Sequence, residues 1–209
     1  MRGLNAAALA VLTATGAGAV IVPGRLTVVV FDYAGAPPKL LASAAREGQR
    51  ALRTAGVETD WILCSPMQSC YVPERFVKVR IIPRRIANQH TSLDSLGTTT
   101  ACPNTDQCDA SNVFYDSILR FTTAESLPVD VTLGYVIVHE IGHQMGLSHS
   151  SRGIMIAAFT PQDLHNAAAG WLNFGEDDAR ELRAAVARSQ GANAPGRRSW
   201  ISTRSASPE

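Results

Sequence analysis

The segment from His139 to His149, HEIGHQMGLSH, contains three of the five histidines of the chain. In an α-helix each residue turns by about 100°, so His139 and His143, four positions apart, lie on one face about one turn from each other. Both imidazoles can therefore reach the same metal ion. Gly146 can adopt a left-handed backbone conformation that ends the helix and turns the chain. His149 can then return toward the helix as a third ligand.

Three histidine ligands leave the fourth position of a tetrahedral zinc ion open, which distinguishes a catalytic zinc site from a closed structural one. Water fills that position, and zinc lowers its pKa toward about 7. Glu140 is rotated by about 100° from His139, which lets it flank the metal without ligating it. We therefore predict one catalytic Zn²⁺ held by His139, His143 and His149. Glu140 is the predicted general base, which removes a proton from the water during attack on a carbonyl.

The pattern HExxHxxGxxH, followed by Met155 in GIM, resembles the metzincin clan of zinc peptidases. The resemblance implies an α+β fold with a metzincin-like twisted, mixed and mainly parallel sheet, an active-site helix and a small C-terminal subdomain below a cleft. The specific match spans only about seventeen residues. It implies roles for six of them: His139, His143 and His149 as ligands, Glu140 as base, Gly146 as the turn, and Met155 as the methionine of the Met-turn beneath the metal.

The expected function is that of a secreted zinc-dependent endopeptidase acting on a peptide or protein substrate. One alternative is an extracellular binding or structural protein that is stabilised by zinc and has no turnover. Another is a zinc hydrolase acting on a non-peptide amide. Glu140 favours an enzyme over the structural alternative, because a purely structural site needs no base beside an open coordination position.

The composition suits one globular domain, since 45% of the 209 residues are hydrophobic and 18% are charged. A formal net charge of +1 gives no field that attracts nucleic acid or an anionic membrane surface. No stretch has the 18 or more uninterrupted apolar residues of a transmembrane helix. We expect a monomer with no nucleic-acid partner and no integral membrane segment, although the sequence does not define the oligomeric state.

The first 19 residues have an early charge at Arg2, then a run of Ala, Leu and Val, then an Ala-Gly-Ala ending. This order is typical of a secretory signal peptide. The sequence thus predicts a signal peptide at 1–19, a catalytic domain at 25–190 and a disordered Ser-, Arg- and Pro-rich tail at 191–209. A secreted or periplasmic location follows.

Four cysteines occur as two C-x5-C pairs, Cys64 with Cys70 and Cys102 with Cys108. An oxidising compartment favours disulfide bonds, but four cysteines allow three connectivities and the sequence does not choose among them. A second metal site, or a thiol that holds the zinc of a zymogen, is the alternative. The C-x5-C spacing is not the usual zinc-finger spacing, so we predict disulfides.

Strand and helix patterns alternate in the first half of the chain, which predicts a crossover connection and at least one parallel strand pair. Residues 84–110 are polar and predict a loop-dominated region. The expected strands are 25–33, 58–64, 75–83 and a short one within 111–116; the expected helices lie within 36–56, after 116, within 133–147 and within 177–191.

Other candidate residues receive structural roles. His90 and His165 lie outside the motif and are expected to be surface or locally bonded side chains. Tyr115 can assist oxyanion binding, although packing beside the active-site helix is the favoured interpretation. Trp171 and Phe174 are expected to anchor the C-terminal helix onto the lower subdomain.

Overall fold

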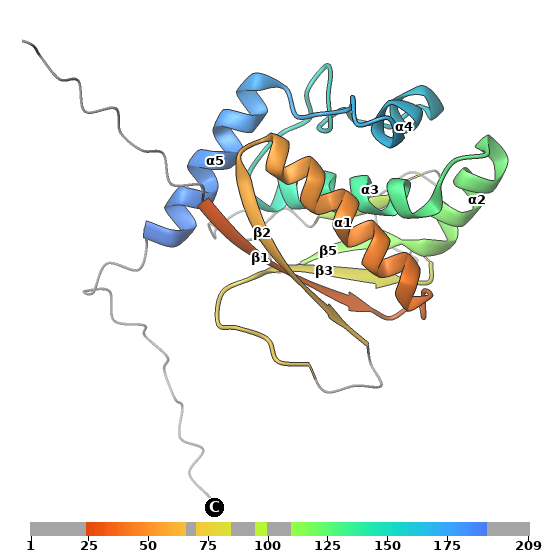
Figure 1. Cartoon of the computed structure of the whole chain (residues 1–209), viewed down its shortest axis with the longest axis horizontal. Coiled ribbons are helices and arrows are strands. Elements are labelled where there is room, and N and C mark those ends of the chain that lie inside the picture. Colours follow the sequence, from red (N-terminus) through yellow and green to blue (C-terminus); the bar gives the residue numbers. More distant parts are fainter. Residues whose placement is uncertain (1–23, 66–69, 85–94, 100–109, 192–209) are drawn as a thin grey trace, which may run out of the picture.

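The computed structural model describes residues 24–65, 70–84, 95–99 and 110–191. They form a mixed sheet with helices packed against it (Figure 1). The strands are β1 (Gly24–Asp32), β2 (Val57–Cys64), β3 (Val77–Ile82), β4 (Gly97–Thr99) and β5 (Ser111–Phe114). The helices are α1 (Pro38–Thr54), α2 (Tyr115–Glu125), α3 (Val129–Gln144), α4 (Pro161–Ala168) and α5 (Glu176–Gly191).

The strands lie in the order β2-β1-β3-β5-β4. Neighbouring strands are parallel from β2 to β5, whereas β4 runs antiparallel to β5. The parallel pairing of β1 with β2, across α1, confirms the parallel pair that the strand-helix-strand order predicts. The mixed sheet with its helices confirms the predicted α+β class. In the part of the chain that the structure describes, β4 is the last strand at its end of the sheet.

Local sequence explains why β1 and α1 form where they do. β1 carries Val28, Val29 and Val30, which are β-branched and almost completely buried. α1 begins with a proline at its first position, where the missing N–H costs no helical hydrogen bond. The buried residues of α1 recur at helical spacing and form the stripe that faces the core: Leu41, Ala44, Ala45, Gly48, Ala51 and Leu52.

Helix α3 is buried along most of its length and lies beside α1 on the sheet (Figure 1). Two glycines allow the helices to approach closely. A Cβ on Gly134 of α3 would lie 2.6 Å from the carbonyl oxygen of Ala44 in α1. A Cβ on Gly48 of α1 would lie 3.3 Å from a methyl carbon of Val138. The position of the active-site helix therefore depends on small residues at this crossing.

We expect Gly134→Ala to lower the free energy of unfolding by about 1–2 kcal/mol. Overpacking at 2.6 Å against a backbone carbonyl, which cannot rotate away, costs about 2–3 kcal/mol, and the better helix propensity of alanine offsets about 1 kcal/mol of that. Urea denaturation measures the change, with Thr123→Ala on the exposed surface of α2 as control. A Gly134→Ala variant as stable as wild type would contradict the close helix crossing.

Several expectations need correction. Helix α4 was not predicted, and β4 lies in the region expected to be loops. The anchoring role of Trp171 is wrong, because its side chain is 76% exposed, whereas Phe174 is buried as expected. Tyr115 packs against the core cluster, in agreement with its structural interpretation.

Cys64, at the end of β2, forms a disulfide bond with Cys70. The disulfide prediction is thus confirmed for the first pair, with a local connectivity. Cys102, Cys108 and His90 lie outside the described residues, as do the predicted signal peptide and residues 192–209 of the predicted tail. None of the helices within the described ranges is both long and apolar enough to cross a bilayer.

Candidate active site

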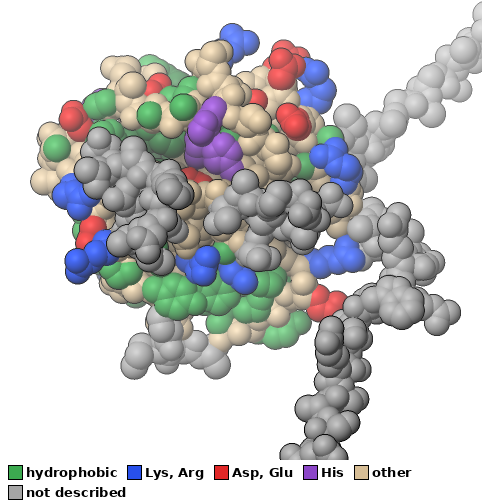
Figure 2. Space-filling model, turned by 180° about the vertical axis from the view of Figure 1, so that it is seen from behind, with side chains coloured by type: hydrophobic (Ala, Val, Ile, Leu, Met, Phe, Trp, Pro, Cys, Tyr) green, Lys and Arg blue, Asp and Glu red, His purple; other side chains and the backbone are tan. Residues whose placement is uncertain are grey.

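The three histidines of the motif converge at one point on the surface. Figure 2 shows histidine side chains gathered together on one face of the molecule. The Nε2 atom of His143 lies 3.0 Å from Nε2 of His139 and 3.1 Å from Nε2 of His149. His139 is the deepest of the three and His149 is exposed. Two tetrahedral zinc ligands at about 2.0 Å are separated by roughly 3.3 Å, so this spacing fits a zinc ion.

The hydrogen bonds of the Nδ1 atoms show which tautomer His139 and His143 adopt, and so which nitrogen has a free lone pair. Nδ1 of His139 lies 2.8 Å from the carbonyl oxygen of Ile154, and Nδ1 of His143 lies 2.8 Å from that of Leu147. A carbonyl oxygen only accepts, so each Nδ1 carries a proton. This backbone bond fixes the tautomer with an unprotonated Nε2, as in many metal-binding histidines.

Burial keeps the two helical histidines neutral. Burial lowers the pKa of His139 to about 4, although the hydrogen bond to Ile154 opposes the shift. Burial also lowers the pKa of His143 below its usual value. Two neutral rings whose Nδ1 atoms are protonated present only acceptors at Nε2, and acceptors 3.0 Å apart repel each other. A cation between them removes this repulsion, so the donor set is suited to a metal.

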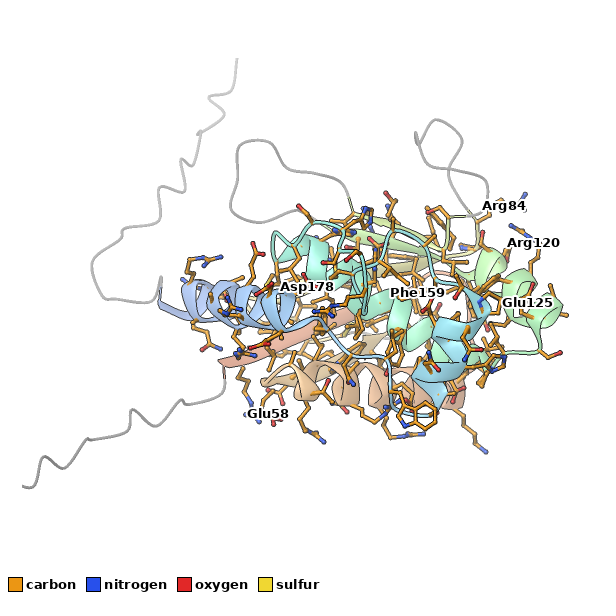
Figure 3. All side chains as sticks on the ribbon, turned by 90° about the horizontal axis from the view of Figure 1, so that it is seen from above. Glu58, Arg84, Arg120, Glu125, Phe159 and Asp178 are labelled. Carbon is orange, nitrogen blue, oxygen red and sulfur yellow. A yellow bond between two sulfur atoms is a disulfide. The ribbon has the colours of Figure 1, made fainter. Side chains whose placement is uncertain are left out.

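The chain beyond α3 brings His149 back to the helix. Gly146 has a φ of 92°, in the left-handed region, and Leu147 N donates to the carbonyl oxygen of Gly142 over 3.0 Å. Ser150, next to His149, donates from Oγ to Asp178 Oδ1 over 2.6 Å. Asp178, labelled in Figure 3, lies in the first turn of α5. The loop that carries the third histidine is therefore tied to the C-terminal helix.

Met155 packs directly beneath the active-site helix. Its side chain is completely buried, and a Cβ placed on Gly142 would clash with its Sδ atom. Gly142 immediately precedes His143 on α3. Met155 therefore lies against α3 at the residue that precedes His143.

Glu140 lies on α3 between the two helical histidines and is only 4% exposed. Its Oε2 accepts a hydrogen bond of 2.6 Å from Thr99 Oγ1 in β4. Burial raises the pKa of Glu140 to about 7, and the Thr99 hydroxyl opposes that shift. A carboxylate whose pKa lies near neutrality is suited to accept and return a proton.

A cleft of about 910 Å³ joins the histidine cluster to Glu140. Its lining includes β4 together with Ser95 and Leu96, and residues 156–159. Phe159, labelled in Figure 3, places its ring centroid 5.6 Å from that of His139. His165, on α4, does not line this cleft and is exposed, which agrees with the expectation of a surface side chain.

Sequence reasoning missed most of the walls of this cleft. Thr99 lies in a strand of three residues, which is too short to give a periodic signal. Ala157, Ala158 and Phe159 come from a segment without regular structure. Only the polar run of threonines at 98–100 hinted at side chains able to donate hydrogen bonds.

Comparisons with known proteins give a family and a fold. Residues 84–183 match the sequence model of the Matrixin family of peptidases (M10). The chain is similar in fold to archaemetzincin from Methanopyrus kandleri, with a TM-score of 0.55 and 11% sequence identity. The similarity covers 81% of this chain and 99% of the archaemetzincin chain. No curated protein matches the sequence.

The matrixin match includes the segment HEIGHQMGLSH and Met155, and the archaemetzincin likeness supports the fold. The convergent histidines add a cluster suited to a metal ion. The matrixin match, the archaemetzincin-like fold and the histidine cluster together support a zinc metallopeptidase of the metzincin clan.

Proposed function

We propose that the chain is a secreted endopeptidase in which Glu140 is the general base and His139, His143 and His149 hold one catalytic zinc ion. The observation that carries this proposal is the convergence of three Nε2 atoms at 3.0–3.1 Å, beside a buried carboxylate in an open cleft. Secretion is supported by the Cys64–Cys70 disulfide, because such bonds persist mainly in oxidising compartments.

The histidines and Glu140 have different roles in the proposed hydrolysis. A zinc ion at the histidine cluster would polarise the scissile carbonyl and lower the pKa of water to about 7. Glu140 takes a proton from the attacking water and later passes it to the leaving amine. The bonds from His139 to Ile154 and from His143 to Leu147 keep both rings in the ligating tautomer throughout.

The edge strand β4 offers a way to hold an extended peptide. It lines the cleft and, among the described strands, pairs only with β5. An extended substrate can add to such an edge through main-chain hydrogen bonds, as in other peptide-binding sheets. The apolar residues around the cleft, including Val136, Ile156 and Phe159, then contact the substrate side chains.

Removal and return of zinc tests the proposed activity. Incubation of the purified protein with a chelator is expected to abolish cleavage of a quenched peptide library, because the three histidines alone cannot polarise the carbonyl. Stoichiometric zinc is expected to restore it. Cleavage that persists in metal-free protein would contradict the proposal. So would a parallel substrate screen in which the protein hydrolyses only non-peptide amides.

A further inference from the structure

A chain of side-chain hydrogen bonds runs from the centre of the sheet to the carboxylate of Glu140. We propose that Thr99 is a positioning residue that fixes the Glu140 carboxylate in the orientation needed for catalysis, and that Ser111 and Gln144 fix the hydroxyl of Thr99. This inference rests on the proposed role of Glu140 as the base. It assigns a function to three residues that the metzincin motif does not include.

The direction of the hydrogen-bond chain is set at Gln144. Nε2 of Gln144 lies 2.9 Å from the carbonyl oxygen of Lys78 in β3. A carbonyl oxygen cannot donate, so the amino group of the Gln144 amide must face it, and the amide cannot be flipped. The same nitrogen lies 2.7 Å from Ser111 Oγ and donates to it as well. Ser111 is therefore an acceptor toward Gln144.

The hydroxyl proton of Ser111 then turns toward Thr99. The nearest other partner of Ser111 Oγ is Thr99 Oγ1, at 2.5 Å, whereas the carbonyl oxygen of Glu140 is 3.3 Å away. Thr99 accepts this proton and has one of its own to donate. Its nearest acceptor is Glu140 Oε2, at 2.6 Å. When Glu140 is ionised, as it must be to act as a base, each donor thus points to the next, from the Gln144 amide to the carboxylate.

The other carboxylate oxygen, Oε1 of Glu140, lies close to the backbone of β4 at Gly97. A Cβ on Gly97 would lie 2.6 Å from Glu140 Oε1, so only the bare backbone of glycine fits against it. Gly97 and Thr99 are alternate residues of β4 and lie on the same face of the strand. The strand therefore approaches Oε1 closely at Gly97 and donates a hydrogen bond to Oε2 from Thr99.

Three of the four residues in these hydrogen bonds are buried: Ser111 is completely buried, Gln144 is 5% exposed and Glu140 is 4% exposed. Thr99 is half-buried and lines the cleft. A hydrogen bond in such surroundings is stronger than one exposed to solvent, and neighbouring bonds polarise one another. Gln144 follows Glu140 by four residues on α3, so the helix supplies both ends of the hydrogen-bond chain. β4 and β5 supply the two hydroxyls between them.

The test compares Thr99→Val with Thr99→Ser in the zinc-loaded enzyme. Valine has nearly the volume of threonine but no hydroxyl, whereas serine keeps the hydroxyl and loses a methyl. Thr99→Val is expected to lower kcat roughly ten- to hundredfold, because the lost bond is to a charged group in a catalytic orientation. KM is expected to stay within about twofold, since Thr99 bonds Glu140 and not the substrate. Thr99→Ser is expected to keep kcat within about threefold.

Variants further from the carboxylate give graded effects. Ser111→Ala and Gln144→Met remove the support of the Thr99 hydroxyl but leave it in place, so each is expected to lower kcat by only roughly three- to tenfold. Combined with Thr99→Val, neither is expected to lower kcat further, because residues that act through one another are not additive. Losses of kcat that add up in the double variants would show that Ser111 and Gln144 do not act through Thr99, and would overturn that part of the proposal.

Zinc content, melting temperature and crystal structures separate positioning from a structural role. Equal kcat in wild type and Thr99→Val, at equal zinc content, would overturn the proposal, as would equal losses in the Val and Ser variants. If wild type cleaves nothing, the proposed function itself fails, and the crystal structures decide. A Glu140 carboxylate displaced in Thr99→Val and unmoved in Thr99→Ser supports the positioning role, whereas an unmoved carboxylate in both overturns it.

Discussion

Glu140→Gln is expected to lower kcat roughly 10²- to 10⁴-fold while zinc content stays as in wild type. The amide of glutamine has the shape of the carboxylate but cannot accept a proton at neutral pH. Its oxygen can still accept the hydrogen bond from Thr99, so the buried site keeps its packing. The loss is therefore expected in catalysis and not in folding or metal binding.

Steady-state kinetics on a peptide cleaved by wild type, with metal analysis of the same samples, measures this change. Glu125→Gln is the matched control, since Glu125 is exposed at the end of α2 (Figure 3). The control is expected to have the kcat of wild type. A Glu140→Gln variant that retains more than about a tenth of wild-type kcat would contradict the role of Glu140 as base.

His143→Ala is expected to lower zinc affinity by more than about 100-fold and to abolish cleavage at ordinary zinc concentrations. Loss of residues that merely orient a ligand costs about 10- to 100-fold in affinity, so loss of a ligand must cost more. His143 is the central member of the cluster, because its Nε2 is within 3.1 Å of both other Nε2 atoms. Its removal leaves two histidine ligands, and no other metal-binding side chain of the described residues completes the group.

Competition with a chromophoric chelator measures the zinc affinity of this variant. His165→Ala, on the exposed surface of α4, is the control and is expected to bind zinc as wild type does. Circular dichroism verifies that both variants fold. A folded His143→Ala protein with wild-type zinc affinity would show that the metal lies elsewhere.

The spacing of the motif was enough to predict the convergence of the histidines. Four residues of helix bring His139 and His143 to one face, and a glycine is needed where φ reaches 92° at Gly146. The strand and helix patterns likewise predicted β1, α1, β2, β3 and α5 close to their observed positions. These features depend on periodicity and on single residues with restricted backbone conformations, both of which are visible in a sequence.

The hydrogen bonds that connect Glu140 to neighbouring side chains could not be predicted from the sequence. Thr99, Ser111 and Gln144 are brought together by the pairing of β4 with β5 and by the packing of α3 on the sheet. Contacts of this kind depend on strand register, and register is not encoded in any local pattern of three residues. Helix α4 was missed for a different reason. Its capping box, Thr160 with Asp163, was present in the sequence, but its apolar stripe is short.

Trp171 shows the limit of arguments from residue type. A large aromatic side chain is usually at least partly buried, yet Trp171 is 76% exposed while Phe174, three residues later, is buried. The backbone between them is fixed by bonds from Trp171 N and Leu172 N to the carbonyl oxygen of Asn166. With the backbone held there, Leu172 and Phe174 are buried and Trp171 is not.

The most direct test of the account is the zinc content of the native protein measured together with its peptide cleavage. Native mass spectrometry of protein that was never exposed to chelator gives the metal, and a quenched peptide library gives the turnover of the same sample. We expect one zinc per chain and cleavage that disappears and returns with the metal. Folded protein that contains no zinc would contradict the assignment of His139, His143 and His149 as its ligands.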